Sequence, residues 1–73
     1  MKIDFKKLEQ LGDELRGIGH KRRELVEKIY QEVQEGDSQS SKELYQELSQ
    51  VSNQAIEIIQ QQKHMIDDAV GRL

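Results

Sequence analysis

The chain has no cysteine, no proline and no tryptophan, and its aromatic residues are one phenylalanine and two tyrosines. Without cysteine it forms no disulfide and offers no thiolate to a metal. Without proline, no residue forces a helix to stop or kink. No stretch approaches the roughly 20 consecutive apolar residues that a membrane-spanning helix needs. These absences leave a chain of polar and charged residues whose sparse apolar side chains must specify the fold.

Those apolar residues make up 34% of the 73 positions and charged residues another 34%, a balance typical of amphipathic surface helices. A chain of this length is one domain at most, and its core is marginal unless copies associate. The amino terminus carries charges where a signal peptide needs an apolar run. We therefore expect a cytoplasmic protein with no membrane association, and association with itself or with another protein.

The first half of the chain predicts a helix over residues 4–35. Its apolar residues recur in steps of three, four or their sum, which places them on one helix face: Leu8, Leu11, Leu15, Ile18, Leu25, Ile29 and Val33. Arg22 occupies the one polar position in this stripe. Two interpretations stay open: its stem lies on the stripe with the guanidinium in water, or the cation pairs across an interface.

Three glycines weaken this helix, at about 1 kcal/mol each relative to alanine. They are Gly12, Gly17 and Gly19, and the apolar spacing continues past them without a skip. We therefore predict one continuous helix. Gly12 and Gly19 are seven residues apart on one flank of the stripe, where small residues let a neighbouring helix approach, so this flank is a candidate docking face.

A turn is predicted over residues 36–40. Gly36 suits the left-handed conformation that commonly ends a helix. Ser40 and Glu43 have the spacing of a capping box, in which the serine hydroxyl accepts from a backbone amide and the glutamate reaches back. The turn should therefore be followed by a second helix over residues 41–72.

The second helix carries its own stripe: Leu44, Leu48, Val51, Ala55, Ile59, Ile66, Ala69 and Leu73, with Gln62 at the centre of its second half. If the chain folds back near Ser38, facing residues have numbers that sum to about 76, and apolar residues face apolar ones almost throughout. The expected fold is an all-α antiparallel two-helix hairpin, a single domain over residues 1–73.

Two helices cannot cover all of their apolar residues. The side chains predicted to stay uncovered, and so to bind a partner, are Val26, Tyr30, Ile56, Ile58, Met65 and Val70. Burying several of them in a second interface would contribute many kcal/mol before association costs. We expect a protein partner, a second copy of the chain or both, so that dimerisation or a partner helix completes a four-helix bundle.

The sequence carries no pattern that indicates catalysis. His20 and His64 are two helical turns out of register with each other, and the adjacent Asp67 and Asp68 point about 100° apart on a helix. No phosphate-binding glycine loop or activated nucleophile is present. The one basic cluster, residues 20–23, is followed at once by acidic residues, which argues against nucleic acid as a partner. We expect no catalytic, cofactor or metal site, no small-molecule substrate, and a non-enzymatic adaptor, chaperone or regulator.

Two resemblances suggest alternatives. The stretch Ser49-Gln50-Val51-Ser52-Asn53-Gln54-Ala55-Ile56 resembles the Ser-Gln-x-x-Asp-x-x-Ile motif of small hairpin phosphatases that act on the aspartyl-phosphate of a sporulation response regulator, and Ile18-x-x-Lys21-Arg22-x-x-Leu25 is similar to their first helix. Asn53 stands where that family has its functional aspartate, so this resemblance implies a degenerate relative. The hairpin plan, with Ala55-Ile56-Glu57-Ile58-Ile59, also resembles the co-chaperones of type III secretion needle subunits.

Overall fold

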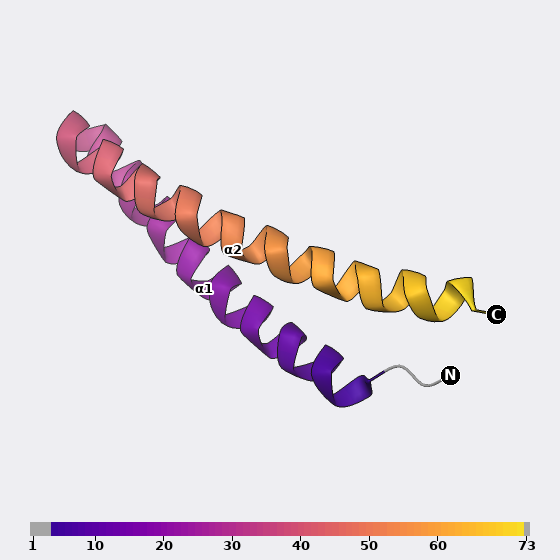
Figure 1. Cartoon of the computed structure of the whole chain (residues 1–73). Coiled ribbons are helices and arrows are strands. Elements are labelled where there is room, and N and C mark those ends of the chain that lie inside the picture. The colour runs from indigo at the N-terminus through magenta and orange to yellow at the C-terminus, as the bar shows by residue number, and fades with distance from the viewer. Residues whose placement is uncertain (1–3, 73) are drawn as a thin grey trace.

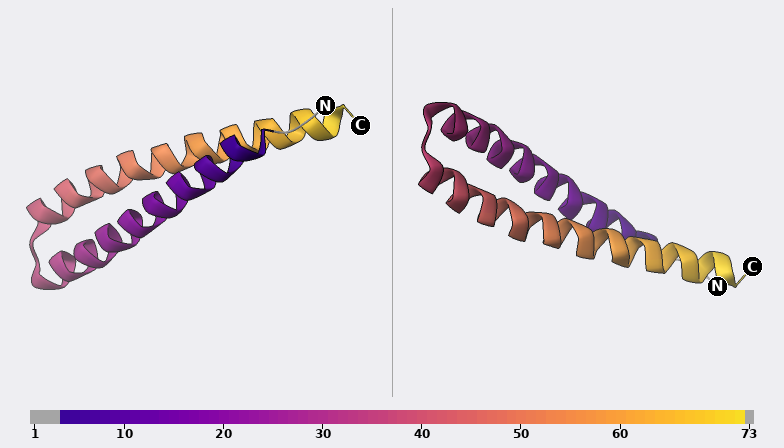
Figure 2. Two further views of the ribbon diagram at one scale, coloured as in Figure 1. Left: turned by 90° about the horizontal axis from the view of Figure 1, so that it is seen from below. Right: turned by 90° about the horizontal axis from the view of Figure 1, so that it is seen from above.

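The computed structural model describes residues 4–72, which form two long helices packed antiparallel (Figure 1). Helix α1 spans Phe5–Glu35 and helix α2 spans Ser38–Gly71. The hairpin measures 55 × 17 × 13 Å, so it is one helix thick. Figure 2 shows that the helices cross at a shallow angle. The predicted all-α hairpin is confirmed, and neither described helix is long and apolar enough to cross a membrane.

The end of α1 is built as the sequence predicts. Gly36 has φ 79°, a left-handed conformation that glycine adopts without a steric cost. Its N–H donates to the carbonyl of Val33 at 3.1 Å, and the N–H of Asp37 donates to the carbonyl of Glu32 at 2.9 Å. These two bonds form a Schellman motif, which satisfies carbonyls that the helix end leaves open. The three glycines of α1 do not interrupt it.

The start of α2 differs from the prediction. Asp37 caps the helix: its Oδ1 accepts from the Ser40 N–H at 3.0 Å, and its Oδ2 accepts from the Ser40 hydroxyl at 2.8 Å. Glu43 instead accepts from Gln39 Nε2 at 3.2 Å, so the predicted Ser40 capping box is wrong. Aspartate caps as well as serine does, and capping at Asp37 lets α2 begin three residues earlier. The turn is therefore residues 36–37 rather than 36–40.

The two helices meet along a seam in which steps of three and four residues alternate. On α1 the covered side chains include Leu8, Leu11, Leu15, Ile18, Leu25, Ile29 and Glu32, and on α2 they include Ser41, Leu44, Leu48, Val51, Ala55, Ile58, Gln62, Met65 and Ala69. This is a heptad repeat, which keeps one stripe facing a partner in a coiled coil. Among residues 4–72, only Leu11, Leu25, Val51 and Ile58 are buried, at 3–8% exposure, because a layer one helix thick shields few positions fully.

The heptad corrects the second half of the stripe predicted for α2. Ile58 is 8% exposed and Met65 is half-buried in the seam, whereas Ile59 and Ile66 are 49% and 45% exposed. The expectation that Ile58 stays uncovered is therefore wrong, as is the placement of Ile59 and Ile66 in the stripe. The predicted stripe took two successive four-residue steps after Val51, and these carry the side-chain direction about 80° past two full turns of a helix. The seam of a supercoiled pair repeats every 3.5 residues instead, so it follows Ile58 and not Ile59. Leu73 lies outside the described residues.

The correction extends to α1 and to the register. Val33, predicted in the stripe, is 61% exposed, and Glu32 takes the seam position instead. The Nε of Arg22 donates to the Ser52 hydroxyl at 2.9 Å, so Arg22 pairs with α2 of its own hairpin. The numbers of two facing residues thus sum to about 74 rather than 76, since the turn is shorter than predicted. A Cβ built on Gly12 would lie 4.0 Å from Gln62 Nε2, in the same register.

Candidate interaction surface

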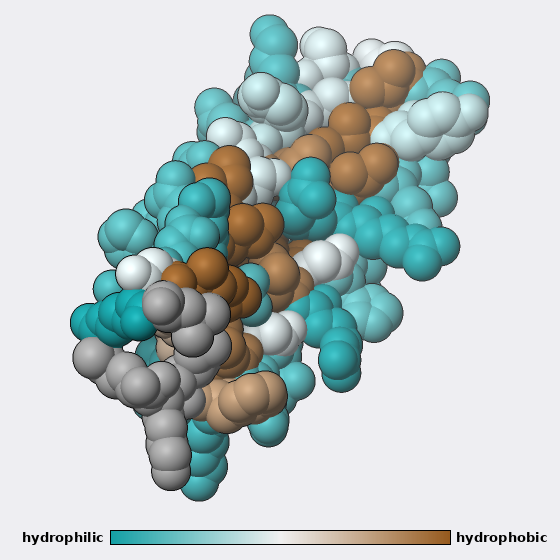
Figure 3. Space-filling view, turned by 90° about the vertical axis from the view of Figure 1, so that its right-hand side faces the viewer, coloured by the Kyte–Doolittle hydropathy of each residue, from teal (hydrophilic) through white to brown (hydrophobic). Residues whose placement is uncertain are grey.

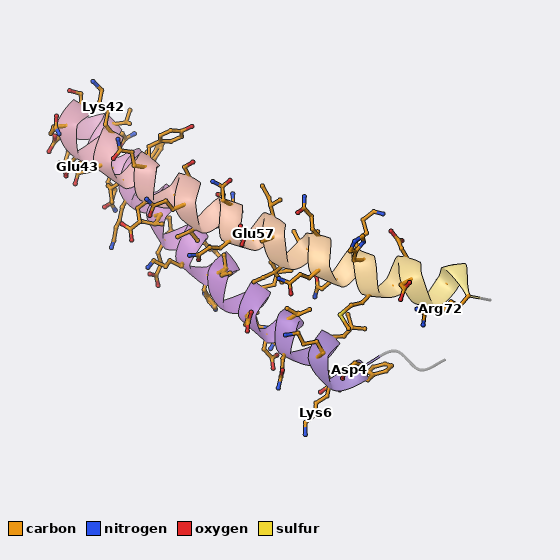
Figure 4. All side chains as sticks on the ribbon, in the orientation of Figure 1. Asp4, Lys6, Lys42, Glu43, Glu57 and Arg72 are labelled. Carbon is orange, nitrogen blue, oxygen red and sulfur yellow. The ribbon has the colours of Figure 1, made fainter. Side chains whose placement is uncertain are left out.

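The seam divides the hairpin into two sides of different chemistry. With the seam positions of each heptad named a and d, the e positions of both helices lie on one side of an antiparallel pair and the g positions on the other. The g positions are all polar, and all but Ser40 are charged or amide residues: Lys7, Glu14, Lys21, Lys28, Glu35, Ser40, Glu47, Gln54, Gln61 and Asp68. Lys21 Nζ lies 3.5 Å from Glu47 Oε1 across this polar side. Lys6 and Lys42, at the f and b positions, point away from the neighbouring helix (Figure 4).

The opposite side carries the exposed apolar residues. Eight of them lie at e positions or at the adjoining b positions, and each is 45–64% exposed; together they form what we name the apolar face: Val26, Tyr30, Val33, Tyr45, Ile56, Ile59, Ile66 and Val70. Figure 3 shows apolar side chains as a brown band that runs along the molecule between polar, teal side chains. The hairpin is therefore amphipathic as a whole, in addition to each helix being so.

The apolar face has two halves. Near the turn, α1 contributes Val26, Tyr30 and Val33, and α2 contributes Tyr45. Toward the termini all four aliphatic residues come from α2: Ile56, Ile59, Ile66 and Val70. At the same level, the e positions of α1 are Gly12 and Gly19, and a Cβ placed on Gly19 would meet nothing within 4 Å. In this half a ridge on α2 thus stands beside a low strip on α1, which ends at Phe5, an e residue that is 71% exposed.

Few charges interrupt the face. Lys63 lies between Ile59 and Ile66 and is paired with Asp67 one turn on. On α1, Arg16 and Arg23 hold b positions, and Arg23 Nε lies 3.6 Å from Glu27 Oε1. These pairs draw Arg23 and Lys63 toward carboxylates, whereas Ser52 and the Arg22 Nε that donates to it interrupt the face between its two halves.

The turn holds the most perturbed carboxyl groups. The Ser40 backbone N–H and hydroxyl, which donate to Asp37, lower the pKa of its carboxyl. Desolvation, followed by the negative charges of Glu35 and Asp37, raises the pKa of Glu32. Within residues 4–72, no group of three or more histidine or acidic side chains could hold a metal ion. His20 and His64 are both exposed. The perturbed carboxyls thus lie at the α2 cap, Asp37, and in the last turns of α1, Glu32.

Four of the six predicted partner-binding residues, Val26, Tyr30, Ile56 and Val70, lie on the apolar face. Met65 and Ile58 do not, because the seam covers them. Sequence reasoning missed Val33, Tyr45, Ile59 and Ile66 as members of the face. Counting strict heptads onward from Leu44 would have found the three on α2, and the same count from Leu11 through Leu25 would have found Val33, since the seam positions follow these counts to the ends of the helices.

The Ser49–Ile56 motif behind the phosphatase resemblance lies on α2. Ser49, Gln50 and Asn53 are exposed, and Ile56 belongs to the apolar face. No protein-family model, no curated protein and no solved structure matches the chain. Any role for the molecule must therefore be argued from the surface itself.

Proposed function

We propose that the chain is a non-enzymatic protein-interaction module, an adaptor, chaperone or regulator that binds through the apolar face. One observation carries the proposal: the exposed apolar residues gather on a single side of a hairpin whose other side is charged and amide-bearing. Contiguous exposed apolar surface with a polar rim is typical of protein-binding sites. Scattered exposed apolar residues would need no such explanation.

The size of the exposed surface supports the same proposal. The chain exposes 6029 Å². A compact protein of 8.5 kDa exposes about 4,700 Å² by the usual scaling of surface with mass. The difference exceeds the roughly 800 Å² that each partner buries in an interface of standard size. An extended hairpin of this kind therefore has surface to spare for a partner.

The energetics define what kind of partner fits. Burying an aliphatic or aromatic side chain fully contributes about 1.5–3 kcal/mol, so covering the exposed half of all eight contributes on the order of 10 kcal/mol. Association itself costs about 4–15 kcal/mol. A tight complex thus needs a partner that also brings an apolar surface, as an amphipathic helix or helix pair does.

The test compares two sides of the same helix. Ile59→Asp with Ile66→Asp places two charges on the apolar face, and Gln54→Asp with Gln61→Asp places two charges at the same seven-residue spacing on the polar side. We expect the first variant to lose association in sedimentation velocity and the second to keep it. Circular dichroism should show helices in both. If the two variants associate equally, the apolar face is not the binding surface.

A further inference from the structure

We propose that the apolar face is covered by a second copy of the chain, stacked in parallel with turn beside turn, so that α2 of each copy lies on α1 of the other. This inference rests on the proposed function and names its partner. The two-fold axis then runs along the hairpin, between the two apolar faces. Such an interface is isologous and closes at two copies.

The shape of the terminal half favours this arrangement. A two-fold axis along the hairpin leaves every residue at the same height along that axis. Residues at the same height, which we call level, within one hairpin are therefore also level between the two copies, and the numbers of facing residues still sum to about 74. Ile56 is then level with Gly19 of the second copy, and Ile59 lies between the levels of Gly12 and Gly19. The α2 ridge of each copy thereby meets the low strip of the other, where the missing Cβ atoms let two helices approach closely.

The turn half is complementary in the same arrangement. Tyr45 is level with position 29, so it stands between Val26 and Val33 of the second copy and beside its Tyr30. All four apolar residues of this half therefore meet apolar residues. Charges also match, since Lys63 lies near the level of Glu9 in the other copy and both are at b positions. Opposite charges at the rim add specificity to apolar burial.

The opposite orientation, turn against termini, places unlike residues together. Each helix would then lie on its own counterpart, inverted about its midpoint. On the face itself, Val70 would then lie between the levels of Ser38 and Lys42, and Tyr30 would lie beside Glu9. Covering charged side chains with aliphatic ones costs their hydration without replacing it. The pattern of residues therefore selects the parallel stack.

Distances between spin labels separate the orientations, because the chain has no cysteine of its own. Ser38→Cys puts one label near the turn, and His64→Cys puts one about 39 Å along α2 at 1.5 Å per residue. In the parallel dimer each labelled variant gives a distance below about 30 Å, since packed helix axes lie about 8–10 Å apart. Mixing the two labelled variants gives a long distance of about 40 Å. A distance of about 50 Å within the Ser38→Cys variant, at 1.5 Å per residue, together with a short one in the mixture, would overturn the proposal.

A matched pair of glycine variants tests the low strip. Gly19→Leu and Gly17→Leu lie two residues apart in α1, and at both a Cβ meets nothing within 4 Å, but only Gly19 is on the face. Both gain helix propensity. We expect Gly19→Leu to weaken dimerisation at least tenfold and Gly17→Leu to leave it unchanged. Equal dimerisation of the two variants would contradict the stacking of α2 on this strip.

Monomeric wild-type protein at about 100 µM would overturn the second copy as partner. An apolar fluorescent dye then distinguishes the two proposals. Dye binding that is lost in the Ile59→Asp, Ile66→Asp variant would leave the interaction face standing with another protein as its partner. A monomer that binds no dye would overturn the proposed function as well.

Discussion

The two sides of the seam share one backbone and differ only in side chains. On the polar side, the g positions pair charges across the helices, as Lys21 does with Glu47. On the other side, the e and b positions expose aliphatic and aromatic residues at the same heptad spacing. Exposed ion pairs contribute little to stability, so the polar side keeps the hairpin hydrated. The seam thus builds the fold, and one of its flanks is left uncovered.

The adjacent residues Ile58 and Ile59 provide the most direct test of the difference between the seam and the apolar face. Ile58 is 8% exposed in the seam and Ile59 is 49% exposed on the apolar face. Ile58→Asp should destabilise the hairpin by about 3–5 kcal/mol, because it removes packing and buries an unpaired charge. With only four buried residues, the hairpin should then unfold. Ile59→Asp should keep the helices and lose association.

Far-ultraviolet circular dichroism and urea unfolding measure the two effects separately. Ile58→Val is the control for the seam, since it removes one methylene and adds no charge. An Ile59→Asp variant that unfolds as fully as Ile58→Asp would show that the face belongs to the folding core of each copy and is not a surface added to it.

The seam and the face were not equally predictable from the sequence. The hairpin followed from two apolar stripes and from Gly36, whose left-handed φ only glycine adopts cheaply. The capping residue did not, because Asp37 and Ser40 are both good caps and tertiary context chose between them. The face was predicted only in part. The 3.6-residue period of a straight helix and the 3.5-residue period of a supercoiled seam select the same positions near Leu44, but they select different ones by Ile58 and Ile59. Supercoiling, which needs both helices, decided that difference.

The turn sets the register of the two helices, so weakening it should lower the stability of the hairpin without changing which side of the seam associates. Asp37→Ala removes the acceptor of the Ser40 N–H and should lower the midpoint of thermal unfolding by about 5 °C at neutral pH. Because the pKa of Asp37 is lowered in the folded state, its contribution is complete above the ordinary aspartate pKa and is lost as pH falls through the lowered value. As the pH is lowered, the stability of the Asp37→Ala variant should therefore fall less than that of the wild type.

Glu32 titrates in the opposite sense. Its raised pKa means that the folded chain binds the proton more tightly, so its contribution to stability falls as pH rises through the glutamate range. Glu32→Gln should accordingly be slightly more stable than the wild type at neutral pH and equal to it in acid. Thermal unfolding between pH 3 and pH 7 measures both variants, and a steeper acid loss in Asp37→Ala than in the wild type would contradict the assignment of the cap.

The smallest effect is expected on the polar side. Lys21→Ala removes the pair with Glu47, whose side chains are 57% and 48% exposed, and should cost less than about 1 kcal/mol. Salt screens such a pair, so the difference from the wild type should shrink between 0.05 and 1 M salt, at roughly 13 and 3 Å of screening length. Association should not change, because the pair lies across the seam from the apolar face. A loss of association in Lys21→Ala comparable to that in Ile59→Asp would mean that both flanks of the seam bind, and the division of the hairpin into a binding side and a hydrated side would fail.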